Sequence, residues 1–192
     1  MILEGIVTTL NADGTVNIAP MGPQVDLERR QIVLRPFQTS TTFQNLNRSG
    51  QGVFHVTDDV ELLARAAIGR VDPLPELMAA EGVEGFRLAD TCRWHAFRVR
   101  HGDDQSPRAT FVADVVATGH VRDFFGFNRA KHAVVEAAIL ATRTHLLSSE
   151  EIAGEFAKLK ILIDKTGGPQ EHRAFALLGD YVAAAGKRGG NG

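Results

Sequence analysis

The sequence predicts a mainly β protein with some α structure: a small antiparallel barrel followed by a C-terminal helical cap. The first part of the chain holds short β-branched segments separated by Gly, Pro, Asn and Asp, which is typical of strands joined by turns. From Asn128 onward apolar residues recur every three or four positions, which is typical of helices. A chain of 192 residues can hold one barrel with an appended helical part. We therefore expect a barrel over 1–122, a cap over 123–188 and a flexible tail over 189–192.

Composition and charge exclude several classes of function. The formal net charge is −2, so nothing global attracts nucleic acid or an anionic membrane, and an anion needs a local site. The single cysteine, Cys92, excludes an internal disulfide and fits a reducing cytoplasm. The chain has neither a basic leader before its first apolar residues nor an uninterrupted apolar span. We expect a cytoplasmic protein without a signal peptide, a membrane span or a metal site.

Strand and turn signals follow one another in the first half of the chain. Asp13-Gly14 predicts a tight hairpin turn, and Pro20 ends the second hairpin strand because proline cannot donate to a ladder. Asp59 is typical of a helix N-cap. The strands are predicted at 2–10, 15–19, 31–35, 52–57, 91–100 and 108–118, a turn at 26–30, and helices at 42–47, 59–69 and 73–80.

Helix signals dominate the last third. Asn128 can cap a helix whose alanines lie on one face, and Ser148 and Glu151 have the spacing of a capping box. A third helix begins near Pro169. This cap is expected to pack on the barrel or on a second subunit.

The segment from Arg35 to Thr42 is the candidate ligand site. It places a guanidinium before four successive hydroxyl residues, Thr39, Ser40, Thr41 and Thr42, at a helix start. Hydroxyls, free helix N–H groups and a guanidinium together can hold a phosphate. Alternatively, the hydroxyls only cap the helix and Arg35 is solvated.

The order of these segments resembles the FMN-binding split barrel of the flavin reductase-like proteins. The resemblance is carried by Thr15–Gly22 (TVNIAPMG), the strand ending in Arg35, the hydroxyl run, and Ser49-Gly50 followed by Val53–Val56 (VFHV). The whole chain is similar to a family of unknown function in which a Greek-key split barrel precedes a helical tail. Its matching tail segments are Asn128–Val134, Ala141–Arg143 and Lys165–Gly168.

The resemblance implies a homodimer that binds FMN at the subunit interface. Arg35, Thr39, Ser40, Thr41 and Thr42 would then hold the phosphate. The strand residues that would run along the isoalloxazine edge are Asn17, Ile18, Ala19 and Met21. The implied function is flavin-dependent oxidoreduction of a small molecule or a reduced carrier.

Two alternatives stay open at this stage. The chain lacks a GxGxxG fingerprint after a strand, so a tightly held nicotinamide dinucleotide is not supported, and a non-catalytic flavin-binding or carrier module is the second hypothesis. The barrel could also hold another anionic ligand, such as a different flavin form or haem.

Other residues have simpler interpretations. His132 and Glu136 share a helix face but lack a third metal ligand in register. Trp94 is expected in the core and Cys92 in packing. Arg129 and Lys165 could reach a flavin phosphate from a second subunit or simply lie at helix ends.

Overall fold

The computed structural model describes residues 1–26, 28 and 30–189, and for residues 187–189 only the backbone. Residues 190–192 of the predicted tail therefore lie outside the described part. The chain forms two compact units, which are described separately. The segment Asp58–Pro73, which the sequence pattern places in the barrel, belongs to the helical unit. The first unit contains Met1–Thr57 and Leu74–Phe124, and the second contains Asp58–Pro73 and the chain from Phe125 onward.

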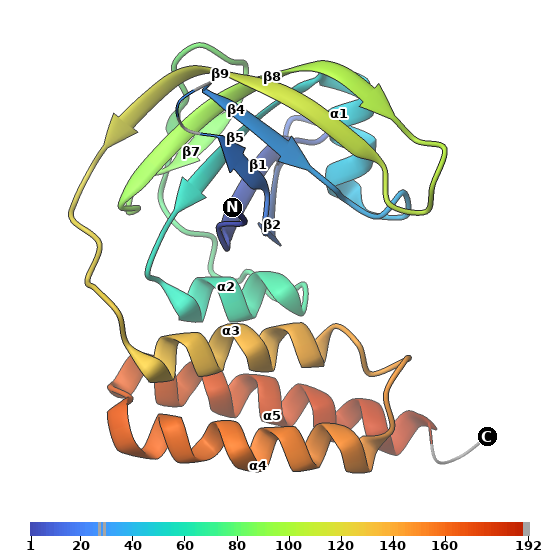
Figure 1. The fold of residues 1–192 in the computed structure, drawn as a ribbon, viewed down its shortest axis with the longest axis vertical. Helices are drawn as coiled ribbons and strands as arrows, with labels where there is room; N and C mark the ends of the chain where they lie inside the picture. Colours follow the sequence, from blue (N-terminus) through green and yellow to red (C-terminus); the bar gives the residue numbers. More distant parts are fainter. Residues whose placement is uncertain (27, 29, 190–192) are drawn as a thin grey trace. The chain divides into compact units, whose positions relative to one another are not determined.

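The first unit is an antiparallel sheet of seven strands that curls around one apolar core, in the order β2-β1-β5-β8-β9-β4-β3 (Figure 1). After intervening segments, β5 returns to β1 and β9 returns to β4, as in a Greek key. The strands are β1 (Gly5–Leu10), β2 (Val16–Met21), β3 (Gln24–Asp26), β4 (Gln31–Leu34), β5 (Gln51–Val56), β8 (Arg93–Asp103) and β9 (Thr110–His120).

The barrel is closed on one side and split on the other. The first residues of the chain pair with β3: the Val25 N–H donates to the Met1 carbonyl at 2.8 Å, and the Leu3 N–H to the Pro23 carbonyl at 3.1 Å. No described strand pairs with the outer edge of β2. The sequence pattern missed β3 because three residues are too few to show an alternation.

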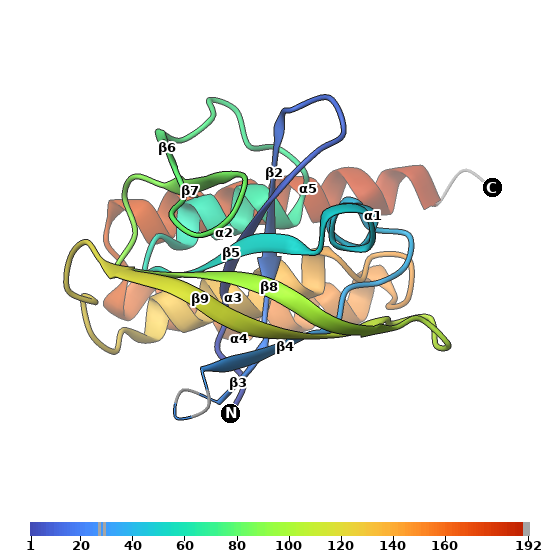
Figure 2. The ribbon, with the colours of Figure 1, turned by 90° about the horizontal axis from the view of Figure 1, so that it is seen from above.

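The core of this barrel comes from one face of each strand. Val7, Leu34, Phe54, Phe97 and Phe111 are all at most 4% exposed and form one cluster. The helix α1 (Thr41–Ser49) adds Leu46 to this cluster and lies at the end of β5 away from β6 and β7 (Figure 2). The barrel predicted from strand spacing is therefore confirmed, together with its interposed helix.

A short hairpin covers the outer face of β5 and β8. It consists of β6 (Leu77–Ala79) and β7 (Phe86–Leu88), where the sequence predicted a helix over 73–80. That prediction was wrong because Pro73 and Pro75 lie two residues apart; proline disfavours helical dihedrals in the residue before it and donates no N–H. Under the hairpin, Val83 packs with Val53, Trp94 and Ala96.

His55 joins this hairpin to the barrel from a fully buried position. Its Nδ1 lies 3.1 Å from the carbonyl of Ile6, and its Nε2 lies 3.0 Å from the N–H of Leu88. A carbonyl only accepts and an amide only donates, so the ring must be neutral and protonated on Nδ1. The side chain thereby fixes β7 against β1 and β5.

The second unit is a bundle in which α3 (Arg129–Ala141) packs against α2 (Val60–Ala67), α4 (Ser149–Thr166) and α5 (Pro169–Gly189). The buried face of α3 is almost entirely alanine, which lets the neighbouring helices approach closely. The predicted caps are confirmed: Asp59 and Asn128 accept from first-turn amides, and Ser148 and Glu151 form a capping box.

Within the described residues, no helix has the length and apolarity needed to cross a membrane.

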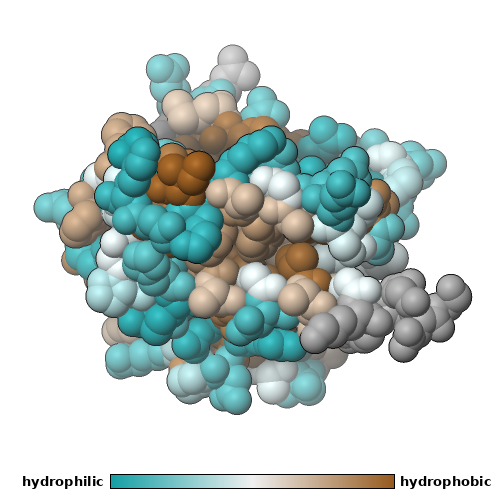
Figure 3. Space-filling model, turned by 90° about the horizontal axis from the view of Figure 1, so that it is seen from below, coloured by the Kyte–Doolittle hydropathy of each residue, from teal (hydrophilic) through white to brown (hydrophobic). Residues whose placement is uncertain are grey.

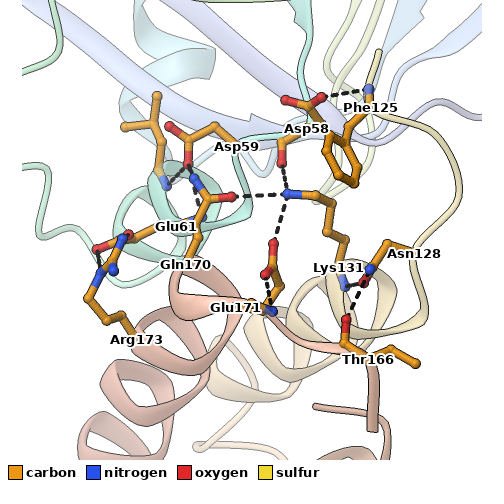
Figure 4. Close-up of polar contacts among 12 residues, drawn as sticks. Asp58, Asp59, Glu61, Phe125, Asn128, Lys131, Thr166, Gln170, Glu171 and Arg173 are labelled. Carbon is orange, nitrogen blue, oxygen red and sulfur yellow. Dashed lines mark hydrogen bonds and ion pairs between the residues drawn. The ribbon is translucent and has the colours of Figure 1, made fainter. Parts of the chain in front are cut away.

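A polar cluster joins α2, α3 and α5 of this unit (Figure 4). The Lys131 ammonium donates to the Asp58 carbonyl at 2.7 Å and to Gln170 Oε1 at 3.0 Å, and it pairs with Glu171 Oε1 at 2.8 Å. The Phe125 N–H donates to Asp58 Oδ2 at 2.8 Å. Three acceptors satisfy the three protons of the ammonium, so this lysine holds the bundle together and has no donor left for a ligand.

Candidate functional site

The start of α1 has backbone N–H groups without a hydrogen-bond partner among the described residues. Ser40 is its N-cap: the hydroxyl accepts from the Phe43 N–H at 3.2 Å and donates to the Phe37 carbonyl at 2.7 Å. The N–H groups of Thr41 and Thr42 have no hydrogen-bond partner among the described residues, and the first turn contains no acidic side chain. Such a helix start favours an anion through its free amides and its dipole.

Arg35, Thr39 and Thr41 are exposed and belong to the segment that leads from β4 into this helix start. None of the three side chains has a hydrogen-bond or ion-pair partner within the part of the chain that the structure describes. Ser40 is different, because its hydroxyl already serves as the cap. The cap interpretation of the hydroxyl run therefore holds for Ser40, and the phosphate interpretation stays a prediction for Thr39 and Thr41.

Arg108 is a second cation beside the site that the sequence did not reveal. It forms an isolated bridge with Phe37 across the sheet, and its guanidinium lies 4.2 Å from the centre of the Phe37 ring. Both side chains are exposed. Arg108 lies here because β9 pairs with β4 and because Arg108 itself bridges to Phe37, beyond the end of β4. A single sequence carries no signal for this pairing.

Buried amides and hydroxyls tie α1 to β1 and β2. Asn17 Nδ2 donates to Thr42 Oγ1 and to Thr9 Oγ1, each at 3.1 Å. Asn45 Nδ2 donates to Thr9 Oγ1 at 3.0 Å and to Asn11 Oδ1 at 2.7 Å. Thr9, Thr42 and Asn45 are at most 4% exposed. Thr42 is therefore engaged inside the protein, where it holds the helix start against β2.

The free edge of β2 carries unpaired backbone groups at defined positions. Asn11 donates its N–H to the Thr15 carbonyl, and hydrogen-bonded pairs in an antiparallel ladder recur every two residues. Asn17, Ala19 and Met21 face Thr9, Val7 and Gly5 in that register. Their backbone groups point to β1, so between Asn17 and Met21 the groups that point away from the sheet belong to Ile18 and Pro20.

The side chains of β2 alternate accordingly. Ile18 lies opposite Thr8, whose hydroxyl donates to the Phe86 carbonyl at 2.6 Å, so Ile18 faces the side of the outer hairpin. Ala19 and Met21 lie on the side of Val7, and Met21 packs against the barrel core. The structure thus brings the two predicted segments together through Asn17 and Thr42, with Ile18 and Pro20 presenting backbone groups at the edge.

A separate hollow of about 90 Å³ opens in the first unit and contains none of the predicted residues. Its polar lining includes His95, Arg30, Gln31 and Thr118, among apolar walls such as Phe54. Burial lowers the pKa of His95, and the charges of Arg93 and Arg30 lower this pKa further. The imidazole is therefore neutral at neutral pH.

Two of the other candidates, Trp94 and Cys92, are packed inside the protein as expected. Trp94 is 5% exposed under the outer hairpin, and Cys92 is 1% exposed. His132 contacts the Phe127 ring edge-on at 6.1 Å. Arg129 and Lys165 are exposed, and nothing in the structure assigns them to a ligand. Among the described residues, no group of three or more His, Cys, Asp or Glu side chains could hold a metal ion.

A curled antiparallel barrel with one open edge, an interposed helix and a C-terminal helical unit together define a split-barrel fold with a helical extension. Family models described as "Protein of unknown function (DUF447) N-terminal domain" and "Protein of unknown function (DUF447)" match residues 3–122 and 128–180. The chain belongs to the DUF447 family. The family predicted from the sequence pattern is thereby confirmed.

Solved structures share this fold. The FMN-bound protein MM1853 from Methanosarcina mazei, also of DUF447, is 24% identical over 94% of each chain, with a TM-score of 0.81. The 2-nitrobenzoate 2-nitroreductase NbaA of Pseudomonas fluorescens is 18% identical, with 62% of this chain and 64% of that chain covered and a TM-score of 0.53.

The flavin reductase of styrene monooxygenase from Pseudomonas putida S12 is 13% identical, with 63% of this chain and 82% of that chain covered and a TM-score of 0.53. No curated protein matches the chain.

Proposed function

We propose that this protein binds FMN, with the phosphate at the start of α1 and the isoalloxazine along the free edge of β2. The observation that carries the proposal is the contact between Asn17 and Thr42, which joins the start of α1 to β2, a strand with one uncovered edge among the described residues. A flavin mononucleotide has its phosphate at one end and a ring with hydrogen-bonding edges at the other. The two features of the site match these two ends.

The phosphate end fits the groups that the structure leaves available. Arg35 would supply a full positive charge, Thr39 and Thr41 would donate hydroxyl protons, and the amides of Thr41 and Thr42 would donate along the helix dipole. Arg108 adds a second cation next to Phe37. The absence of an acidic residue from the first turn of α1 removes the repulsion that an anion would otherwise meet.

The ring end fits the edge of β2. The N–H and carbonyl of Ile18 and the carbonyl of Pro20 are directed away from β1, so they can pair with the nitrogen and oxygen atoms of a flavin edge. The FMN in the structure of MM1853, a member of the same family, supports the same cofactor here. Side chains of Asn17, Ala19 and Met21 would act by positioning this strand.

The bound flavin would supply electron or hydride transfer, and the protein would bind and orient it. We propose oxidoreduction of a small molecule or a reduced carrier, a proposal supported by the reductases among the structural neighbours. The second candidate is a flavin-binding or carrier module without turnover. It is favoured by one observation: the residues of the proposed site include no carboxylate, histidine or thiol that could act as an acid or base.

A homodimer with the flavin at the subunit interface belongs to the same proposal, since β2 has an edge that no described strand covers. The cytoplasmic location likewise stays a prediction.

The test is a titration of the flavin-free protein with FMN, followed by reduction. We expect quenching of FMN fluorescence on binding, and faster bleaching of the bound flavin by NADH, NADPH or another reduced carrier than of free FMN. Bound flavin that no physiological donor bleaches would favour the carrier. A protein that takes up no FMN would contradict the proposal.

A further inference from the structure

The second unit has an apolar groove between α4 and α5 that its own helices leave open. The groove has a volume of about 630 Å³, and among its lining residues only Ser149 and Lys160 have polar side chains. Phe156 and Phe175 lie in it with ring centres 5.2 Å apart. The remaining lining residues are Ala153, Ala157, Gly179, Val182, Ala183 and Gly186.

The groove lies on a face that is apolar well beyond its lining. Figure 3 shows tan and brown residues across the middle of this face, surrounded by teal ones. Ile161 of α4 is 52% exposed, although isoleucine is among the residues most often buried. Only Ile152 and Ile163 of this 18-residue helix are fully buried. An apolar surface with a charged rim is typical of a protein–protein contact.

Gly179 is not explained by packing inside the unit. A Cβ atom at this position would meet no atom within 4 Å, and its backbone does not have positive φ. Glycine inside a helix costs about 1 kcal/mol relative to alanine. A helix of another chain packed closely against Gly179 would explain the glycine, because glycine allows two helix backbones to approach closely.

We propose that the occupant of the groove is a second copy of this chain, with the two α4 helices antiparallel about a two-fold axis. The charges of α4 are self-complementary in this arrangement. Glu150 lies near its N-terminus, and Lys160 lies in its second half on the groove rim, where its ammonium also pairs with Asp164 of the same helix at 2.6 Å. A two-fold axis at the level of residue 155 sets Glu150 of each chain opposite Lys160 of the other.

The same axis sets Ala153 opposite Ala157 of the other copy, so the helices meet through their smallest side chains. Helices that meet in this way pack at roughly 8 Å between axes, which fills the groove with the partner's helix. Because every contact occurs twice in an isologous interface, two ion pairs and two alanine contacts form together. This surface belongs to the helical unit and does not depend on flavin binding.

A charge-reversal cycle tests the proposal in flavin-free protein by sedimentation equilibrium. Glu150→Lys alone sets a lysine opposite Lys160 of the other copy, and Lys160→Glu alone sets a glutamate opposite Glu150. Because every contact occurs twice, each single variant places two pairs of like charges across the interface. We expect each single variant to weaken association by about tenfold. The double variant restores opposite charges across the axis and should associate like the wild type. Failure of the double variant to recover would overturn the proposal.

A second pair of variants tests the centre of the groove. Ala157→Glu places a charge in the apolar contact and should abolish the association made by α4, without affecting any pairing through the barrel. Lys158→Glu places a glutamate on a neighbouring face of α4, changes the charge of the helix by one unit more, and should not weaken this association. Circular dichroism melts of both variants control for folding. Equal association of the two, or a wild-type protein that stays monomeric at high concentration, would overturn the second copy as occupant. FMN titration should be unchanged in all these variants, which separates this result from the proposed function.

Discussion

Asn17 on β2 and Thr42 in the first turn of α1 are 25 residues apart in sequence and joined by a hydrogen bond of 3.1 Å. This bond connects β2 to the start of α1, the two parts of the proposed site. Thr9 shares the same donor, so the contact is part of a buried network and not a chance surface pair. Its strength therefore determines how well the two halves of the proposed site stay aligned.

Replacing Thr42 by valine should separate the structural role of the hydroxyl run from its binding role. Thr42→Val keeps the shape of a buried side chain but removes the acceptor of Asn17, at a cost of about 1 kcal/mol. We expect the thermal midpoint to fall by about 2–4 °C. Thr41→Val, at an exposed position, should leave the midpoint unchanged and weaken FMN binding instead. Equal thermal shifts in the two variants would contradict this division of roles.

Removing the guanidinium of Arg35 should weaken FMN binding without affecting the fold. Arg35→Ala loses a charge-assisted hydrogen bond worth about 1.5–3 kcal/mol, which corresponds to a roughly tenfold to hundredfold higher Kd. The measurement is FMN fluorescence titration, with Arg93→Ala as control because Arg93 is another exposed arginine of the same unit. Unchanged affinity in Arg35→Ala would remove this residue from the site.

His55 should make the stability of the protein depend on pH. Burial lowers its pKa from 6.5 to about 4, so between these values the unfolded chain binds a proton that the folded chain does not. The stabilisation is complete above pH 6.5 and is lost as the pH falls towards 4, with a loss of about 2 kcal/mol between pH 7 and 5.

Urea unfolding at the two pH values measures this loss. His55→Gln should remove most of the dependence, and the remaining slope comes from His95, whose pKa is also lowered by burial. His101→Gln, at an exposed position, should keep the full dependence. A wild-type protein equally stable at both pH values would show that His55 does not carry the effect.

Lys131→Met should destabilise the helical unit strongly. It leaves Glu171, whose side chain is 8% exposed, without its cation, and breaking a buried pair in this way costs about 3–5 kcal/mol. Glu171→Gln in the same chain removes the buried charge while it keeps an acceptor for the Gly168 N–H, and should recover part of the loss.

Lys158→Met is the matched control. It removes one partner of the exposed pair with Glu155 and should cost under about 0.5 kcal/mol. Chemical denaturation followed by circular dichroism compares the three variants. A loss in Lys131→Met no larger than in the control would show that the cluster is dispensable.

The sequence predicted the elements whose signals are local. The hairpin turn at Gly14, which has φ +84°, and the caps at Asp59, Asn128 and Ser148 depend on residues within a few positions of one another. The predicted helix over 73–80 failed because Pro73, read as a helix start, is followed by Pro75, and the residues after it pair as β6 with β7.

The candidate site was predictable only as two separate segments. The hydroxyl run and the strand from Asn17 to Met21 carry recognisable patterns, but their meeting depends on Thr9 and Asn45, which have no signal of their own. Arg108 escaped for the same reason, since its place beside Phe37 depends on how distant strands pair. Thr42 carried a misleading signal, because its hydroxyl looks available in sequence and is buried in the fold.

Pro20 has a consequence for how the protein behaves before it meets any ligand. An exposed sheet edge invites a foreign strand to continue the ladder, which is a common origin of aggregation. Pro20 offers such a strand a carbonyl but no amide proton. The carbonyl of the foreign strand opposite Pro20 would therefore stay unpaired. The ring nitrogen of Pro20 thus discourages polymerisation through the edge of β2, although no described strand covers that edge.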